Sequence, residues 1–395
     1  MKNEVTLAPL PSISDIFSAL FRPKLAEVQL AESWCRDDEN GVWLSQSAWS
    51  IFVIAKCRMA MFGNNQRQIT VWIPEYFCNI SLVYLRELGV KIVFYPIDQE
   101  MLPDVEWCYQ ESIKSKSDIF VHVHYFGKVV PVENTFKFCK EMGAWLIEDC
   151  AHVLRPIPGI GEYGDFVLYS PHKTLAIPDG AVLIARKSGP SLIFESIDVI
   201  NQLLEIKALI KHTGSTFFPS LVWLCKRFLQ RIGLRGRIGI SGFWPDMPCE
   251  LSSFASPNMS TFAKKLLSTQ VQSLDEIGML REQNLKIWEK CSVNRCNLYH
   301  KLKILTFDTP PYLAAVSFDN KDDAERYFNL LQSDGFLVQT WPDLPPEVLN
   351  NPVQYSTSIF LRQSRFFFPV HQTISIDETK NLSKRATQLF LENGE

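Results

Sequence analysis

Short β-branched runs alternate with amphipathic segments from about residue 40 to residue 190, and this alternation limits the fold more than any other feature of the chain. Alternation of this kind is typical of a mostly parallel sheet that is covered by helices. The expected strands are Ile69–Ile73, Lys91–Tyr95, Ile119–His124, Trp145–Glu148, Phe166–Tyr169 and Ala181–Ala185. The expected helices between them are Ser47–Met61, Ile80–Leu88 and Val132–Met142.

The chain has 395 residues, which is more than one hydrophobic core usually organises, so we expect two domains. We expect an N-terminal arm at 1–40, a large α/β domain at 41–190, a helical insertion or connection at 191–257, and a smaller C-terminal α/β domain at 258–395. The insertion should hold helices at Ser191–Ile210 and Ser220–Ile232, and one or two long helices should follow at 258–300. In the C-terminal part of the sequence we expect strands at Tyr312–Phe318 and Phe336–Thr340, and helices at Lys321–Asp334 and Asp377–Glu392.

Composition excludes several classes of function. A net charge of −3 gives no electrostatic attraction to nucleic acid. The ten cysteines form no Cys-x-x-Cys pair, which favours reduced thiols over a disulfide framework and argues against a structural metal site. The N-terminus lacks the uninterrupted apolar core of a signal peptide, and the chain contains no apolar run long enough to span a membrane. We therefore expect a soluble, cytoplasmic protein.

Two charged residues follow neighbouring apolar runs. Asp149 closes the run that begins at Trp145, and Lys173 lies between the runs that end at Tyr169 and begin at Ala181. Ligands of open parallel sheets bind outside the carboxyl ends of the strands. A lysine and a carboxylate placed there suit pyridoxal 5'-phosphate (PLP), because the lysine can form a Schiff base and the carboxylate can keep the pyridine nitrogen protonated. Taken alone, Asp149 is better explained by a helix cap and Lys173 by a surface turn.

Other residues add weaker signals. Ser47, Ala48 and Trp49 open an apolar helix, where backbone N–H groups can bind a phosphate, and Ser170 is a second candidate phosphate donor. His152 follows Asp149 by three residues and could contact the cofactor ring. An aromatic residue in the segment after Pro74 could stack on that ring. A serine cap, a structural histidine and ordinary core aromatics are the alternatives.

The order of these motifs resembles the DegT/StrS family of fold-type I PLP enzymes, best known as nucleotide-sugar aminotransferases. The resemblance covers about residues 40–190. It continues in Trp341-Pro342-Asp343-Leu344-Pro345 and Phe368-Pro369-Val370-His371-Gln372. It implies a Schiff-base lysine at Lys173, a pyridine-nitrogen partner at Asp149, His152 beside the ring, Ser170 on the phosphate, and Ser47 with Ala48 and Trp49 as backbone cradle. Phe77 or Cys78 falls at the ring-stacking position.

The resemblance further implies a homodimer that transfers an amino group, from glutamate in most of the family, to a keto-sugar in polysaccharide or secondary-metabolite biosynthesis. This chain departs from the family pattern in three places: Ser170 and Lys173 are only three residues apart, Gly180-Ala181 replaces Gly-Gly, and Trp49 is bulky. Alternatives are a dehydratase or an enzyme of the same fold with a non-sugar substrate, and a non-catalytic protein that keeps the fold. Dehydratases of the group usually replace the lysine, which favours amination.

A basic stretch at 220–237 contains Lys226, Arg227, Arg231, Arg235 and Arg237 among apolar residues. It could rest on an anionic membrane surface or bind a diphosphate. A solvated helix face is the more ordinary meaning of such a run, and it is the interpretation that the sequence favours.

Overall fold

The computed structural model describes the chain except for residues 1–4, 22–24, 38, 63–66, 188, 191–216, 232–241, 245–255, 294–301, 306–308 and 394–395. The expected helix at Ser191–Ile210 therefore lies outside the described residues. None of the described helices is long and apolar enough to cross a membrane.

The larger sheet has seven strands in the order β1-β7-β6-β5-β4-β2-β3. Its strands are β1 Gly41–Leu44, β2 Thr70–Pro74, β3 Lys91–Tyr95, β4 Ile119–Val123, β5 Trp145–Cys150, β6 Phe166–Tyr169 and β7 Ala181–Ala185. The pairs from β3 to β6 are parallel, whereas β7 is antiparallel to both β6 and β1. The predicted strands are thus confirmed, and β1 is an additional edge strand.

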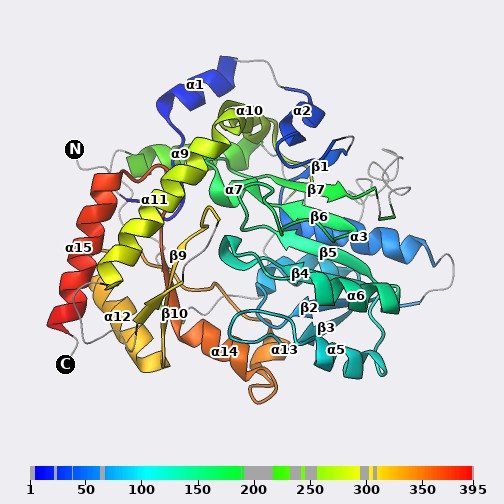
Figure 1. Ribbon diagram of the computed structural model, residues 1–395. Helices are drawn as coiled ribbons and strands as arrows, with labels where there is room; N and C mark the ends of the chain where they lie inside the picture. Colours follow the sequence, from blue (N-terminus) through cyan, green and yellow to red (C-terminus); the bar gives the residue numbers. More distant parts are fainter. Residues whose placement is uncertain are drawn as a thin grey trace.

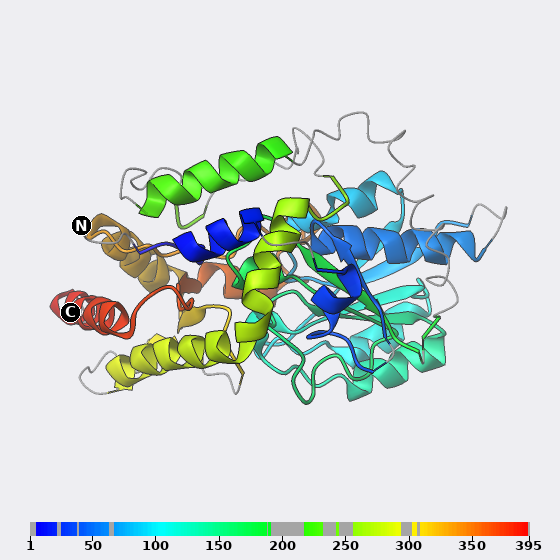
Figure 2. The ribbon, with the colours of Figure 1, turned by 90° about the horizontal axis from the view of Figure 1, so that it is seen from above.

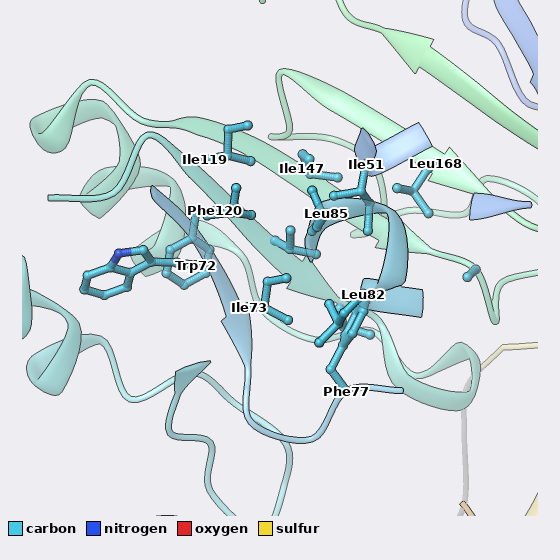
Figure 3. Packing of buried hydrophobic residues seen from close by; sticks show 14 of the residues in the cluster. Ile51, Trp72, Ile73, Phe77, Leu82, Leu85, Ile119, Phe120, Ile147 and Leu168 are labelled. Carbon is cyan, nitrogen blue, oxygen red and sulfur yellow. The ribbon is translucent and has the colours of Figure 1, made fainter. Parts of the chain in front are cut away.

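Helices cover both faces of this sheet. Helix α3 (Ser47–Ala60) lies on one face and α6 (Glu133–Met142) on the other, as Figure 2 shows. The short elements η1 (Asn79–Leu82) and α4 (Val83–Glu87) together occupy the predicted helix at 80–88, and α5 (Val105–Ser112) packs beside α6. Apolar residues from both strands and helices form the core that Figure 3 shows, including Ile51, Trp72, Phe120 and Leu168. Strands β2, β4, β5 and β6 are buried along their whole length, because helices cover both of their faces.

The C-terminal part forms a second, three-stranded antiparallel sheet of β8 (Leu302–Ile304), β9 (Ala314–Phe318) and β10 (Arg365–Phe368) in the order β10-β9-β8. It has its own apolar core with α12 (Lys321–Ser333) and α15 (Ile376–Glu392). The strand predicted at Phe336–Thr340 is wrong, since the segment forms only an isolated bridge between Gln339 and Phe367. Its apolar side chains Phe336 and Val338 fill the core without extended pairing.

The segment that leads into the smaller sheet contains α10 (Thr261–Gln270), the short 3-10 helix η5 (Val271–Ser273) and the long α11 (Leu274–Val293). Figure 1 shows α11 running from the large sheet toward α15. The N-terminal helices α1 (Ile13–Phe21) and α2 (Glu27–Ala31) and the insertion helix α9 (Phe217–Arg231) gather around α10. The short helices α13 (Pro346–Leu349) and α14 (Ser356–Gln363) lie beneath the large sheet in the same view. The domain boundaries predicted from the sequence remain predictions.

Candidate active site

Polar residues meet where the parallel strands β4, β5 and β6 end. Asp149 lies at the end of β5, and Ser170 directly follows β6. The register pairs Val123 with Asp149 and Cys150 with Tyr169, so the carboxyl ends of these strands share one edge of the sheet. The one-turn helix α7 (Pro171–Thr174) then carries Lys173 to this edge.

Asp149 is buried, and its Oδ1 atom accepts the N–H of Ala151 at 2.9 Å. Burial raises the pKa of this carboxyl above its usual range, while the nearby Lys173 ammonium opposes that rise. Burial likewise lowers the pKa of Lys173 below 10.5, and Asp149 and Cys78 work against that shift. The predicted lysine and carboxylate therefore share one electrostatic environment from which water is largely excluded.

His152 connects this pair to the rest of the site. Its Nε2 atom lies 3.2 Å from Nζ of Lys173, and its Nδ1 atom accepts the N–H of Phe126 at 3.2 Å. Burial lowers the pKa of His152 well below its usual value, and the positive charge of Lys173 lowers it further. The ring is therefore neutral.

Aromatic side chains hold the imidazole of His152 in place. Tyr312 stacks on the imidazole with ring centroids 4.7 Å apart, and Phe126 stacks on it with centroids 5.7 Å apart. Trp341 meets the imidazole edge-on at 5.8 Å. Trp341 occurs in a sequence motif noted above. The sequence did not indicate that Tyr312 would join it, because Tyr312 comes from the segment before β9 of the smaller sheet.

The start of α3 reaches the site through strand pairing. Leu44 of β1 pairs with Ala181 of β7, and the N–H of Gly180 donates to the carbonyl of Ser45 at 2.8 Å. The carbonyl oxygen of Gly180 in turn accepts the N–H of His172 at 3.3 Å. It also lies 2.9 Å from Nδ1 of the His172 ring. Gly180 has φ +139°, and an added Cβ would lie 2.7 Å from Met259, so this close passage favours glycine.

The predicted phosphate cradle is partly available. The first N–H groups of a helix have no acceptor within the helix, and Gln46, the N-cap of α3, makes no side-chain cap. The N–H of Trp49, however, already donates to the carbonyl of Gln46 at 3.1 Å. The Trp49 ring stacks on Tyr84 at 3.9 Å in the core, so its bulk points away from the cradle. Ser47 and Ala48 are left as the backbone donors best placed for an anion.

Ser170 is the second residue that the sequence predicted as a phosphate donor. Its side chain is fully buried, and its Oγ atom has no hydrogen-bond partner among the described residues. A buried hydroxyl without a partner costs free energy, which a bound acceptor would recover. Together with the buried Asp149 and the amine of Lys173, this hydroxyl fits PLP, which carries a phosphate, a basic ring nitrogen and an aldehyde.

The two candidates for ring stacking differ in position. Phe77 points into the core beside Leu82 and Ile73 (Figure 3). Cys78 is partly buried, and its charge state is coupled to that of Lys173. The Cys78 thiol donates to Oδ1 of Asp343 at 3.2 Å, and that oxygen also accepts the N–H of Asn79 at 3.1 Å. Of the two candidates, Cys78 is therefore the one that lies near Lys173. Its side chain is a small thiol and not an aromatic ring.

Arg281 of α11 fixes the segment that carries Lys173. The guanidinium is buried and donates to the carbonyl of Thr174 at 2.8 Å and to that of Pro311 at 2.9 Å. Gln372 donates to the same Thr174 carbonyl at 3.1 Å and accepts from Nε of Arg281 at 3.0 Å. The tail motif that ends in Gln372 thus supports the lysine from the C-terminal part of the chain.

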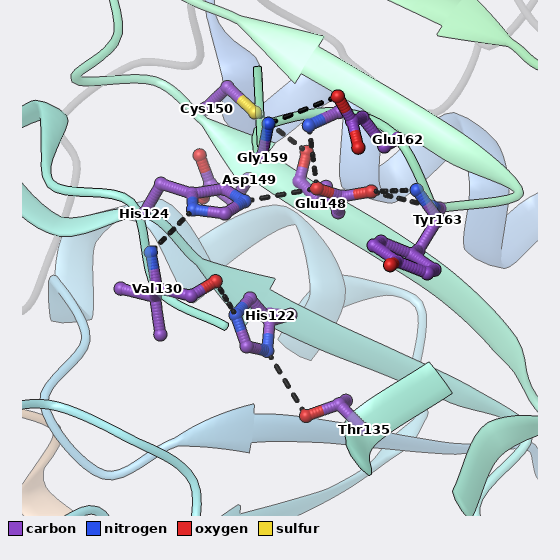
Figure 4. Close-up of polar contacts among 12 residues, drawn as sticks. His122, His124, Val130, Thr135, Glu148, Asp149, Cys150, Gly159, Glu162 and Tyr163 are labelled. Atoms are coloured by element: carbon purple, nitrogen blue, oxygen red, sulfur yellow. Dashed lines mark hydrogen bonds and ion pairs between the residues drawn. The ribbon is translucent and has the colours of Figure 1, made fainter. Parts of the chain in front are cut away.

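A buried polar network lies behind Asp149, as Figure 4 shows. Nε2 of His124 lies 3.0 Å from Oε2 of Glu148, while Nδ1 of His124 accepts the N–H of Val130. The Glu148 carboxylate also accepts the N–H groups of Gly161, Tyr163 and Gly164 at 2.6–2.8 Å. Burial alone would raise the pKa of Glu148, but these hydrogen bonds lower it to about 2. The network fixes the loop between β5 and β6 against the sheet.

The mixed seven-stranded sheet and the smaller antiparallel domain have the architecture of fold-type I PLP-dependent transferases. Within that class, residues 72–189 match the DegT/DnrJ/EryC1/StrS aminotransferase family. The resemblance inferred from sequence motifs is thus confirmed over these residues.

Two relatives match parts of the chain. GDP-perosamine synthase from Vibrio cholerae is 24% identical over 157 residues, which are 38% of this chain and 40% of that protein. Serine hydroxymethyltransferase from Methanocella arvoryzae is 31% identical over 121 residues, 28% of each chain. The matched segments thus span less than half the length of these relatives.

The likeness in fold extends further than the likeness in sequence. A putative sugar aminotransferase from Streptococcus pneumoniae, in its PLP form, superposes with a TM-score of 0.69 at 14% identity. That superposition covers 98% of this chain and 99% of the other. The predicted fold class is therefore confirmed along nearly the whole chain.

Proposed function

We propose that this protein is a PLP-dependent aminotransferase that moves an amino group from glutamate to a keto-sugar carried on a nucleotide. The observation that carries the proposal is the burial of Asp149 beside Lys173 at the strand ends, with His152 contacting the lysine. The family match at residues 72–189 and the GDP-perosamine synthase relative support the reaction class and the sugar acceptor. Both polysaccharide and secondary-metabolite biosynthesis use such amino sugars.

The residues divide the work as follows. PLP, when bound, supplies an aldehyde that condenses with amines and a ring that accepts electrons. Lys173 provides the amine for the covalent attachment and, once released, carries a proton to and from the substrate carbon as general base and acid. The Asp149 carboxylate stabilises positive charge at the ring nitrogen. Ser170 and the N–H groups of Ser47 and Ala48 hold the phosphate, and His152 orients Lys173.

A half-reaction tests this proposal directly. The protein would be loaded with PLP and mixed with glutamate, and the absorbance near 400–430 nm, typical of such Schiff bases, would be followed. Loss of that band with formation of 2-oxoglutarate is expected. A PLP-loaded protein that leaves glutamate unchanged would contradict glutamate as donor, and a screen of other amino acids would follow. Keto-sugar nucleotides would then be offered as acceptors to the aminated form.

The serine hydroxymethyltransferase relative favours a second candidate, a PLP enzyme acting on a non-sugar amino acid. Such an enzyme would cleave or alter serine without leaving the amino group on the cofactor. Serine consumption with the absorbance band retained would support it, whereas amino transfer from glutamate would exclude it as the main activity.

We also propose that the protein is a homodimer, as the family resemblance implies, and that it acts in the cytoplasm. Sedimentation equilibrium of the PLP-loaded protein would give the mass. A monomeric mass at micromolar concentration would contradict the dimer.

A further inference from the structure

Two helices of the described chain present apolar stripes to the outside. On α1, residues Ile13, Phe17, Leu20 and Phe21 are exposed, with Phe17 at 58% and Phe21 at 81%. On α9, Leu221, Cys225, Phe228 and Leu229 are exposed, with Phe228 at 57%. Both sets follow the spacing i, i+4, i+7, i+8, which places each set on a single face of its helix. Large exposed apolar side chains that cluster in this way mark a surface that contacts a membrane or another protein.

The two stripes belong to one region of the molecule. Both α1 and α9 pack on α10, and the guanidinium of Arg231 at the end of α9 donates to the carbonyl of Pro11 just before α1. Figures 1 and 2 both show α1 and α9 in the part of the molecule that surrounds α10. We call this region, defined by the seven residues Ile13, Phe17, Leu20, Phe21, Leu221, Phe228 and Leu229, the α1–α9 surface.

The charges that α9 itself carries are all basic. Helix α9 has no acidic residue and carries Lys226, Arg227 and Arg231. The sequence from 206 to 245 likewise contains no acidic residue, although the whole chain has a net charge of −3. On α1 the carboxylate of Asp15 is already bonded to the N–H of Ser12.

From this combination we infer that the α1–α9 surface binds the face of an anionic lipid bilayer. An interfacial helix buries its apolar face among the acyl chains while basic residues contact the anionic headgroups. A second copy of the chain fits less well, because symmetric pairing would bring the two basic α9 helices toward each other. The interpretation of 220–237 as a plain solvated helix face does not explain why Leu221, Phe228 and Leu229 point outward. This inference is independent of the proposed amino transfer.

The test is co-sedimentation of the full-length, PLP-loaded protein with vesicles. Phosphatidylcholine vesicles containing about 30% phosphatidylglycerol should bind the protein at about 0.1 M salt, and pure phosphatidylcholine should bind it at least roughly tenfold more weakly. Replacing Phe17 and Phe21 with serine should weaken binding by at least roughly tenfold. Lys226→Glu should weaken it several-fold at about 0.1 M salt and much less at about 0.5 M.

A matched control is available on other parts of the molecule. Ile113 and Val353 are 87% and 91% exposed and lie on neither helix, so Ile113→Ser with Val353→Ser should leave vesicle binding unchanged. Because all these positions are exposed, the variants should keep the thermal midpoint and the PLP absorbance of the parent protein. Absence of binding to the anionic vesicles would overturn the inference. So would equal loss in the control, or a change in solution mass of the Phe17 and Phe21 variant without vesicle binding, which would assign the surface to a second copy.

Discussion

Nε2 of His152 lies 3.2 Å from Nζ of Lys173, and the other ring nitrogen of the histidine decides which atom donates. Because Nδ1 accepts the N–H of Phe126, the proton of the neutral ring is on Nε2. An Nε2–H group can donate to the lysine only if the amine has a free lone pair. The contact therefore favours the neutral amine of Lys173, the form that attacks an aldehyde.

Removing the His152 donor should raise the pKa of Lys173. In cofactor-free protein, labelling of Lys173 by trinitrobenzenesulfonate, followed by mass spectrometry across pH, should show a midpoint below 10.5, because burial lowers the pKa. His152→Leu should move that midpoint upward by roughly one pH unit, since the neutral amine loses a hydrogen bond. His152→Gln should stay near the parent value, because its amide can accept from Phe126 and donate to Lys173. A midpoint in His152→Leu equal to the parent would contradict this role.

Ser170→Ala should weaken PLP binding without destabilising the cofactor-free protein. The Oγ atom has no partner among the described residues, so its removal breaks no hydrogen bond there. In the loaded protein, the lost contact with phosphate should cost roughly tenfold in affinity, or ~1.4 kcal/mol. Titration by absorbance and the thermal midpoint of the cofactor-free protein would measure the two effects. Ser364 is also buried with an unpartnered Oγ but lies at the start of β10, so Ser364→Ala should leave PLP affinity unchanged.

The residues of the candidate active site show how much the sequence could predict. Asp149, Ser170 and Lys173 were found because they lie at or just beyond the ends of apolar strands, and parallel strands bring their carboxyl ends to one edge. Tyr312 was missed because it reaches His152 from the segment before β9, more than a hundred residues away, and no local pattern encodes that approach. The strand predicted at Phe336–Thr340 was wrong for a related reason. An apolar run predicts that a segment is buried, and this segment is buried in the core of the smaller domain without joining its sheet.

Asp343→Asn should make Cys78 more reactive. Burial, the charge of Asp343 and the hydrogen bond to Asp343 together raise the pKa of the Cys78 thiol to about 12. Loss of the carboxylate charge should lower the pKa, so alkylation by iodoacetamide at pH 8 should be several-fold faster by mass spectrometry. Cys57 in the same protein is an internal control, because burial alone raises its pKa to about 11. Equal acceleration at both cysteines would point to general loosening instead.

Glu148→Gln should remove a pH-dependent part of the stability. The folded-state pKa of about 2 lies below the ordinary value of 4.5, so the charged carboxylate stabilises the fold above pH 4.5 and this contribution is lost as the pH falls toward 2. The variant should be less stable by on the order of 3 kcal/mol at pH 6, and the difference should shrink at pH 3. Urea unfolding at several pH values would measure it.

The matched control for this variant is Glu162→Gln in the same loop. Glu162 is exposed and accepts only the N–H of Gly159 among its described contacts. Its replacement should change stability little at any pH. A difference between parent and Glu148→Gln that stays constant from pH 6 to pH 3 would show that the charge of Glu148 is not what stabilises the loop.

The most direct measurement concerns Lys173 itself. PLP would be added to the parent protein and to Lys173→Ala, followed by borohydride reduction and peptide mapping. The parent should gain the absorbance near 400–430 nm and carry the reduced label on the peptide that contains Lys173, while the variant should show neither. A label confined to other lysines, or the same band in Lys173→Ala, would contradict the assignment of this lysine as the site of cofactor attachment.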